Sequence, residues 1–111
     1  HLRNHGFLWA GREGWTLSPA YDLNPTPVDL KARVLTTNID LDEGTCSVEL
    51  LEGASEYFGL GIKAARLIIK EVAAATSTWR ETAKELGARP AEINRMASAF
   101  EHDDQNKALK L

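Results

Sequence analysis

The chain has 111 residues, of which 43% are hydrophobic and 26% are charged, and its formal net charge is −3. These values are typical of one soluble globular domain. The negative charge argues against an extensive nucleic-acid surface, because binding to phosphates requires a basic face. The single cysteine, Cys46, cannot form an internal disulfide, and no apolar run approaches the roughly 20 residues that cross a bilayer. We therefore expect a cytoplasmic protein that neither binds nucleic acid directly nor enters a membrane.

Two short aromatic runs near the beginning, Gly6–Ala10 and Trp15–Leu17, are separated by the polar, glycine-flanked stretch Gly11–Gly14. This pattern predicts a β-hairpin. A hairpin returns the chain to the place where it began, so Asn4 and Asp22, which lie just outside its two ends, are expected to come close together. An Asn and an Asp brought together at a strand end can share one hard cation, as the metal-binding Asn and Asp of phosphoryl-transfer enzymes do.

The segments on either side of this hairpin resemble the HipA-like serine/threonine kinases of bacterial toxin–antitoxin systems. The resemblance is carried by His1-Leu2-Arg3-Asn4-His5-Gly6-Phe7-Leu8 and by Leu17-Ser18-Pro19-Ala20-Tyr21-Asp22-Leu23-Asn24-Pro25. In that family a D-x-H-x-x-N segment forms the catalytic loop, and a Tyr-Asp after the hairpin supplies a metal ligand. The resemblance implies that Asn4 and Asp22 bind Mg²⁺ and, through it, ATP, and that His1 is the loop histidine that supports the site. It also implies a protein substrate, such as an aminoacyl-tRNA synthetase, and a small DNA-binding antitoxin as partner.

The catalytic Asp of that pattern would precede His1 and so lie outside this sequence, as would the glycine-rich phosphate loop and the ATP-binding lysine. The parent protein would transfer the γ-phosphoryl group of ATP to a serine or threonine hydroxyl. We expect the 111 residues by themselves to show no kinase activity and to hold neither Mg²⁺ nor ATP. We also expect them to self-associate through apolar surface that a neighbouring lobe would cover.

The rest of the chain has mainly helical patterns. Two prolines make residues 24–29 a loop, whereas β-branched residues in Val34–Leu41 predict a short third strand. Helices are predicted over residues 48–58, with Ser47 as N-cap, over 62–87, as one helix or as two joined near 75–78, and over 90–100, with Pro90 in the first position. Residues 102–107 are predicted to be a polar, fraying end.

The expected fold is therefore α+β and mainly α. It consists of an amino-terminal β-hairpin with a short extra strand, packed on a carboxyl-terminal bundle of three or four helices like that of a kinase C-lobe. We expect a single domain over residues 1–111. Within it, residues 1–30 would carry the catalytic loop and the metal site, and residues 47–101 would form the helical bundle.

Asn4 and Asp22 also have a simpler interpretation, because both residue types are common in turns without any metal. His1 and His5 have the spacing of a metal pair on a helix, but strand-like residues follow them and a third ligand is missing, so we favour structural roles. The acidic turn that begins at Asp40 lacks the Gly and the Glu that a calcium loop requires at its sixth and twelfth positions.

Residues 82–100 offer a different function, because they have the pattern of a helix-turn-helix with Gly87 in the turn. A DNA-reading helix presents several basic or polar side chains at its start, but here acids balance basic residues such as Arg95. We therefore favour a corner of the helical bundle over a DNA-binding module. A structural helical interaction domain is the remaining alternative.

Overall fold

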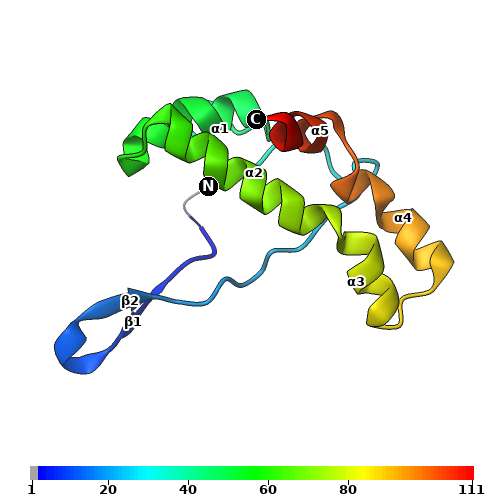
Figure 1. The fold of residues 1–111 in the computed structure, drawn as a ribbon, viewed down its shortest axis with the longest axis horizontal. Coiled ribbons are helices and arrows are strands. Elements are labelled where there is room, and N and C mark those ends of the chain that lie inside the picture. The colour runs from blue at the N-terminus through cyan, green and yellow to red at the C-terminus, as the bar shows by residue number, and fades with distance from the viewer. Residues whose placement is uncertain (1–2) are drawn as a thin grey trace.

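The structure is a computed structural model that describes residues 3–111, so His1 lies outside the described residues. An antiparallel hairpin comes first, an irregular segment follows, and helices make up the second half of the chain. Figure 1 shows the hairpin projecting away from the helices, to which the irregular segment connects it. The fold is α+β and mainly α, as predicted. Within residues 3–111, no helix is both long and apolar enough to cross a membrane.

The predicted hairpin is present as β1 (Phe7–Trp9) and β2 (Trp15–Leu17), with Phe7 opposite Leu17 and Trp9 opposite Trp15. A 3₁₀ turn over Gly11–Glu13 joins the strands. The two tryptophan rings meet edge to face at 5.5 Å, a cross-strand pair that stabilises the hairpin. All strand side chains are exposed. The hairpin therefore does not pack on the helical bundle, although we expected it to do so.

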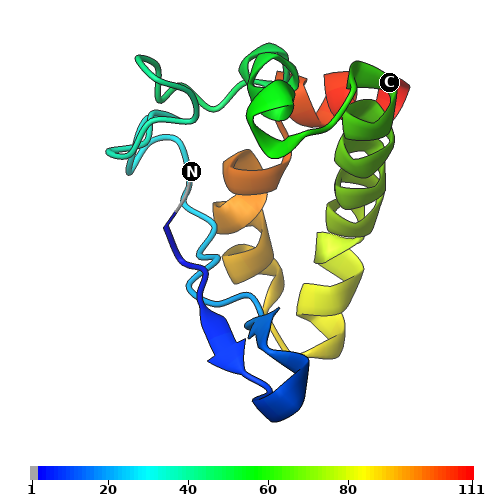
Figure 2. The same cartoon turned by 90° about the vertical axis from the view of Figure 1, so that its left-hand side faces the viewer.

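The irregular segment follows β2 and lies partly against the helices. Residues 18–27 form no helix or strand, as predicted for the proline-rich stretch, and Pro27 is buried. Figure 2 shows this part of the chain passing beside α4 (Pro90–Phe100).

The predicted third strand over residues 34–41 is wrong, because only a single bridge between Val34 and Thr45 forms there. Side chains take the place of a partner strand. Asp40 Oδ1 accepts hydrogen bonds from the backbone amides of Asp42 and Glu43, and Glu43 Oε1 accepts from the amide of Thr45 at 2.8 Å. These local bonds compete with sheet formation and turn the segment into a compact loop.

The helical half begins with α1 (Val48–Ala54), whose N-cap is Ser47, as predicted. A 3₁₀ turn over Ser55–Phe58 extends it to Gly59, which adopts φ 68° and ends the helical stretch. The long periodic pattern that follows divides into α2 (Ile62–Ser77) and α3 (Trp79–Glu85).

The break between α2 and α3 coincides with three consecutive hydroxyl side chains. Thr76, Ser77 and Thr78 each donate a hydrogen bond to a backbone carbonyl three or four residues earlier. Such bonds bend helices, and they explain why one periodic pattern gives two helices. Gly87, at φ 88°, then reverses the chain, and Pro90 opens α4 as predicted.

A final helix, α5 (Asp103–Lys110), replaces the predicted fraying end, which was wrong. His102 caps it, because its Nδ1 accepts a hydrogen bond from the amide of Gln105 at 3.2 Å. Gln105 Nε2 in turn donates to the carbonyl of Ala73 in α2 at 2.6 Å. Ala108 is buried in the small core, which lies where α1, α2 and α5 meet (Figure 1) and also contains Val48, Ile69 and Ala73.

Candidate functional site

The two expected metal ligands are in contact at the open end of the hairpin. Asn4 Nδ2 donates a hydrogen bond to Asp22 Oδ2 at 2.8 Å. Backbone pairing continues beyond the strands, since the amide of Ser18 donates to the carbonyl of Gly6 at 2.8 Å. The hydroxyl of Tyr21 donates to the carbonyl of His5 at 3.1 Å and closes the same end. The hairpin therefore brings the two side chains together, as its pattern predicted.

Asn4 and Asp22 share an unusual backbone conformation. Their φ angles are 61° and 56°, and within residues 3–111 they are the only non-glycine residues with positive φ. Asn and Asp tolerate the left-handed region better than other residues, yet each such residue still costs about 1 kcal/mol or more. Strain of this kind concentrates at functional sites, where the surrounding structure holds it in place.

Asn24 is a further member of the site that the sequence did not indicate. Its Nδ2 donates to Asp22 Oδ1 at 2.6 Å, so both carboxylate oxygens accept hydrogen bonds from side-chain amides. The neighbouring Pro25 made Asn24 look like an ordinary turn residue. The two amide groups therefore fix the direction of the carboxylate.

A polar cavity of about 220 Å³ opens beside the Asn4–Asp22 pair. Three separate segments line it, and they contribute Arg3 with Asn4, then Asp22, and then Lys31, Leu35, Thr36 and Thr37. The residues from 31 to 37 had no motif that marked them, because the way the loop folds back toward the hairpin is a tertiary feature.

The oxygen donors of the pair suit a hard cation such as Mg²⁺ better than a soft transition metal. A carboxylate and amide carbonyls are hard oxygen ligands, and Mg²⁺ is typically held by one or two such groups together with substrate phosphates. Within residues 3–111 there is no group of three or more His, Cys, Asp or Glu side chains that could hold a metal by themselves. The backbone carbonyl of His5 accepts the hydrogen bond from Tyr21, and its ring meets that of Phe7 edge to face at 6.1 Å between ring centroids. The structural role that we favoured for His5 stays a prediction.

Comparison with known proteins places the chain in a family. The model of the HipA-like C-terminal domain matches residues 1–103. The chain belongs to this family. No curated protein matches the chain, and neither does any solved structure. The match extends the resemblance from the hairpin segments through helices α1 to α4 of this HipA-like domain.

The segment that carries Asp22 in the HipA-like domain is anchored to α4. Arg95 Nη1 and Nη2 donate to the two carboxylate oxygens of Asp29 at 3.0 and 2.9 Å. The hydrogen bond from Arg95 is the main reason why the pKa of Asp29 lies below its ordinary value. One residue earlier, the amide of Val28 donates to Ser98 Oγ at 3.2 Å. These contacts give α4 a role in holding the site.

The same contacts bear on the helix-turn-helix alternative. The helices α3 and α4 do form two helices with a glycine turn between them. However, Arg95 is paired with Asp29, Arg89 is paired with Glu92, and Arg80 donates to both Glu101 and Asn94. Cations that are already paired with carboxylates are poorly placed to neutralise DNA phosphates, so we do not propose DNA binding for this HipA-like domain.

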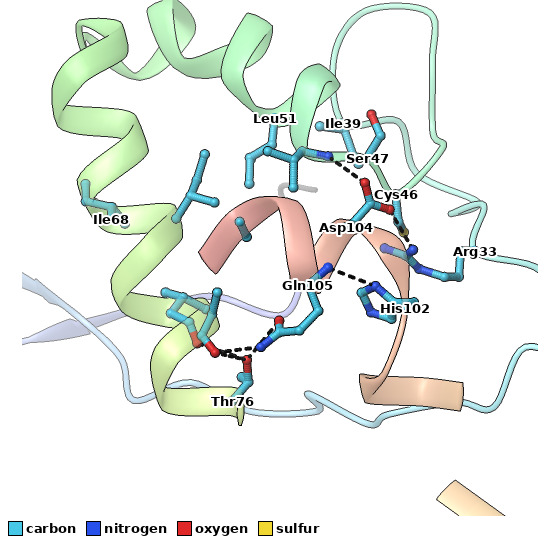
Figure 3. Close-up of a pocket in the computed structure, with 15 residues that line it drawn as sticks. Arg33, Ile39, Cys46, Ser47, Leu51, Ile68, Thr76, His102, Asp104 and Gln105 are labelled. Atoms are coloured by element: carbon cyan, nitrogen blue, oxygen red, sulfur yellow. Dashed lines mark hydrogen bonds and ion pairs between the residues drawn. The ribbon is translucent and has the colours of Figure 1, made fainter. Parts of the chain in front are cut away.

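A second anchor holds the loop that forms the far wall of the cavity. Arg33 Nη1 donates to Asp104 Oδ2 at 2.6 Å, and Asp104 Oδ1 accepts from the amide of Val48 at 3.3 Å. Figure 3 shows Asp104 lying between the loop residue Arg33 and the beginning of α1. Burial by itself would raise the pKa of Asp104, but the hydrogen bonds from Arg33 and Val48, together with the charges of Arg33 and Lys107, outweigh it and lower the pKa.

Proposed function

We propose that this HipA-like domain is the metal-binding part of a serine/threonine protein kinase site. Asn4 and Asp22 would hold Mg²⁺ against the phosphates of ATP. The observation that carries the proposal is the 2.8 Å contact between their side chains at the open end of the hairpin, with both backbones in the left-handed region. Membership of the HipA-like family supports it.

The reaction would transfer the γ-phosphoryl group of ATP to a serine or threonine hydroxyl of a protein. The bond between the γ-phosphorus and the bridging oxygen breaks, ADP leaves, and a new bond forms to the hydroxyl oxygen. When bound, Mg²⁺ would neutralise the charge that develops on the phosphate oxygens. Asn4 and Asp22 would fix the direction of the phosphate groups, and Asn24 would keep the carboxylate of Asp22 in place through the 2.6 Å hydrogen bond.

Two further residues complete the proposed site by family resemblance. An Asp on the amino-terminal side of His1 would accept the proton of the substrate hydroxyl, and His1 would support the loop between that Asp and Asn4. The same resemblance leads us to propose a cytoplasmic location, a protein substrate such as an aminoacyl-tRNA synthetase, and a small DNA-binding antitoxin as partner.

The test uses the complete product of the gene. We expect Asp22→Asn and Asn4→Ala each to reduce the Mg²⁺-dependent release of ADP from ATP by about 100-fold or more, because each removes a group that stabilises transition-state charge. Asp103→Asn is the matched control. Asp103 is an exposed carboxylate in the first turn of α5, so its loss should leave turnover unchanged. If Asp22→Asn retains full turnover, the metal assignment is wrong.

Binding of the metal can be measured separately from turnover. Mn²⁺ is a paramagnetic stand-in for Mg²⁺, and in the presence of ATP it should broaden the amide signals of residues near Asn4 and Asp22. The same titration should leave those signals sharp in the Asp22→Asn variant. Broadening that is equal in the two proteins would contradict the proposal.

A further inference from the structure

We infer that the loop from Lys31 to Thr37 is the phosphate-contacting wall of the site, and that Lys31, with the hydroxyls of Thr36 and Thr37, binds the terminal phosphate of the nucleotide. This inference rests on the proposed metal role of Asn4 and Asp22. It adds residues that follow the hairpin and that no motif in the sequence indicates. The three residues line the same 220 Å³ cavity as the Asn4–Asp22 pair.

The donors on this wall are available for a ligand. Within residues 3–111, the side chains of Lys31, Thr36 and Thr37 form no hydrogen bond and no ion pair. Arg33, in the middle of the same loop, contrasts with them, because its guanidinium is taken up by Asp104. An ammonium group and two hydroxyls, carried by residues that line one cavity, are the kinds of donors that bind phosphate oxygens in proteins.

The charge of the cavity favours an anion. The ammonium of Lys31 and the carboxylate of Asp22 belong to residues that line it. Their charges offset one another, so a bound Mg²⁺ would leave the cavity net positive. Mg²⁺ accompanied by a polyanion is therefore attracted to it more than Mg²⁺ alone. A triphosphate bound through its metal supplies the missing negative charge.

The loop is also held firmly enough to position these donors. The amide of Leu35 donates to the carbonyl of Gly44, and the amide of Cys46 donates to the carbonyl of Arg33, both at 2.8 Å. Asp104 connects the loop to α1 and α5 through Arg33, as Figure 3 shows. The opposite wall is fixed on α4 through Arg95 and Asp29. The cavity therefore lies between two walls that are each attached to the helices.

The experiment measures the affinity of the complete gene product for Mg²⁺–AMPPNP, which has a terminal phosphate, and for Mg²⁺–ADP, which lacks it. We expect Lys31→Ala to weaken AMPPNP binding by about tenfold or more, the usual effect of losing a charge-assisted hydrogen bond, and to change ADP binding by less than about twofold. Lys31→Arg keeps the charge and should restore most of the AMPPNP affinity. Thr37→Val should weaken AMPPNP binding, whereas Thr37→Ser should not.

Lys70→Ala is the matched control, because Lys70 is an exposed lysine on α2 that does not line the cavity. The inference is overturned if Lys31→Ala leaves AMPPNP affinity unchanged, or if it weakens both nucleotides equally. The Asp22→Asn variant separates this failure from failure of the proposed function. If nucleotide binding needs Mg²⁺ and Asp22 but not Lys31, only the role of the wall is wrong. If binding is indifferent to Asp22 as well, the proposed function falls and the inference with it.

Discussion

Asp104 connects three parts of the domain that are distant in sequence, so its replacement should have a large effect on stability. Its carboxylate accepts hydrogen bonds from Arg33 of the loop at 2.6 Å and from the first amide of α1, and Lys107 Nζ lies 3.8 Å away. The Asp104 side chain is only 16% exposed, and that of Arg33 is 30% exposed. Asp104→Ala would therefore remove a partly buried ion pair together with the hydrogen-bond acceptor of the first amide of α1.

The size of the effect follows from those contacts. Each hydrogen bond to a charged group contributes about 1.5–3 kcal/mol. Arg33 is exposed enough to regain water when its partner is lost, which places the total for the two bonds toward the lower end, at about 3–4 kcal/mol. For a domain of this size, such a loss lowers the melting temperature by roughly 10 °C or more.

Urea denaturation followed by far-UV circular dichroism measures this loss directly. The control is Asp103→Ala, because Asp103 lies in the same first turn of α5 but is exposed. It should cost only the helix-dipole contribution of about 0.3–1 kcal/mol. If Asp104→Ala destabilises the chain no more than Asp103→Ala does, Asp104 does not hold the loop.

The same carboxylate makes a prediction about pH. The pKa of Asp104 lies below its ordinary value of 3.8, although burial alone would raise it, because its hydrogen bonds and cationic neighbours favour the charged form. Its contribution is therefore complete well above pH 3.8 and is lost as the pH falls through the folded-state pKa. Asp104→Asn should flatten the stability profile in this acidic range, and an unchanged profile would contradict the assignment.

Three further changes test other contacts. Burial is the main reason, and the charge of Arg33 the second, why the pKa of His102 lies below 6.5. The neutral ring caps α5. The free energy of unfolding should therefore fall as the pH drops from 6.5 toward the folded-state pKa of His102. Asn also caps helices but does not titrate, so His102→Asn should remove this slope in denaturation curves; a persisting slope would assign it to another group. Gly44→Ala would place a Cβ 2.7 Å from the carbonyl oxygen of Leu35 and should cost about 1–3 kcal/mol by forcing the loop apart; a cost below about 0.5 kcal/mol would show that the loop yields easily. Arg95→Ala frees the segment that carries Asp22, so we expect weaker Mg²⁺–nucleotide binding with little loss of helix content; unchanged binding would show that this anchor is dispensable.

The hairpin and the proximity of Asn4 to Asp22 could be predicted because they depend on local chemistry. Aromatic residues favour strands, flanking glycines allow the turn, and a hairpin must bring its two ends together. Capping by Ser47, termination at Gly59 and Gly87, and initiation at Pro90 are likewise local, since each depends on the conformation of one residue.

The features that could not be predicted from the sequence depend on contacts between residues that lie far apart along the chain. The helix α5 is polar along most of its length, and a single buried alanine and the bond from Gln105 to Ala73 secure it against α2. In the same way, Asp104 holds a loop some 70 residues away through Arg33. A hydrophobic pattern cannot reveal such contacts, because the stabilising groups are polar and their partners become neighbours only when the chain is folded.

The sequence by itself therefore determined the hairpin, most helix ends and the pair of Asn4 and Asp22. Only the tertiary structure placed Lys31, Thr36 and Thr37 on the opposite wall of the same cavity. The physical reason is that a hairpin closes through bonds between neighbouring residues. The loop from residue 31 to 37 has no strand or helix of its own, and the ion pair between Arg33 and Asp104 holds it to a helix that lies much later in the chain.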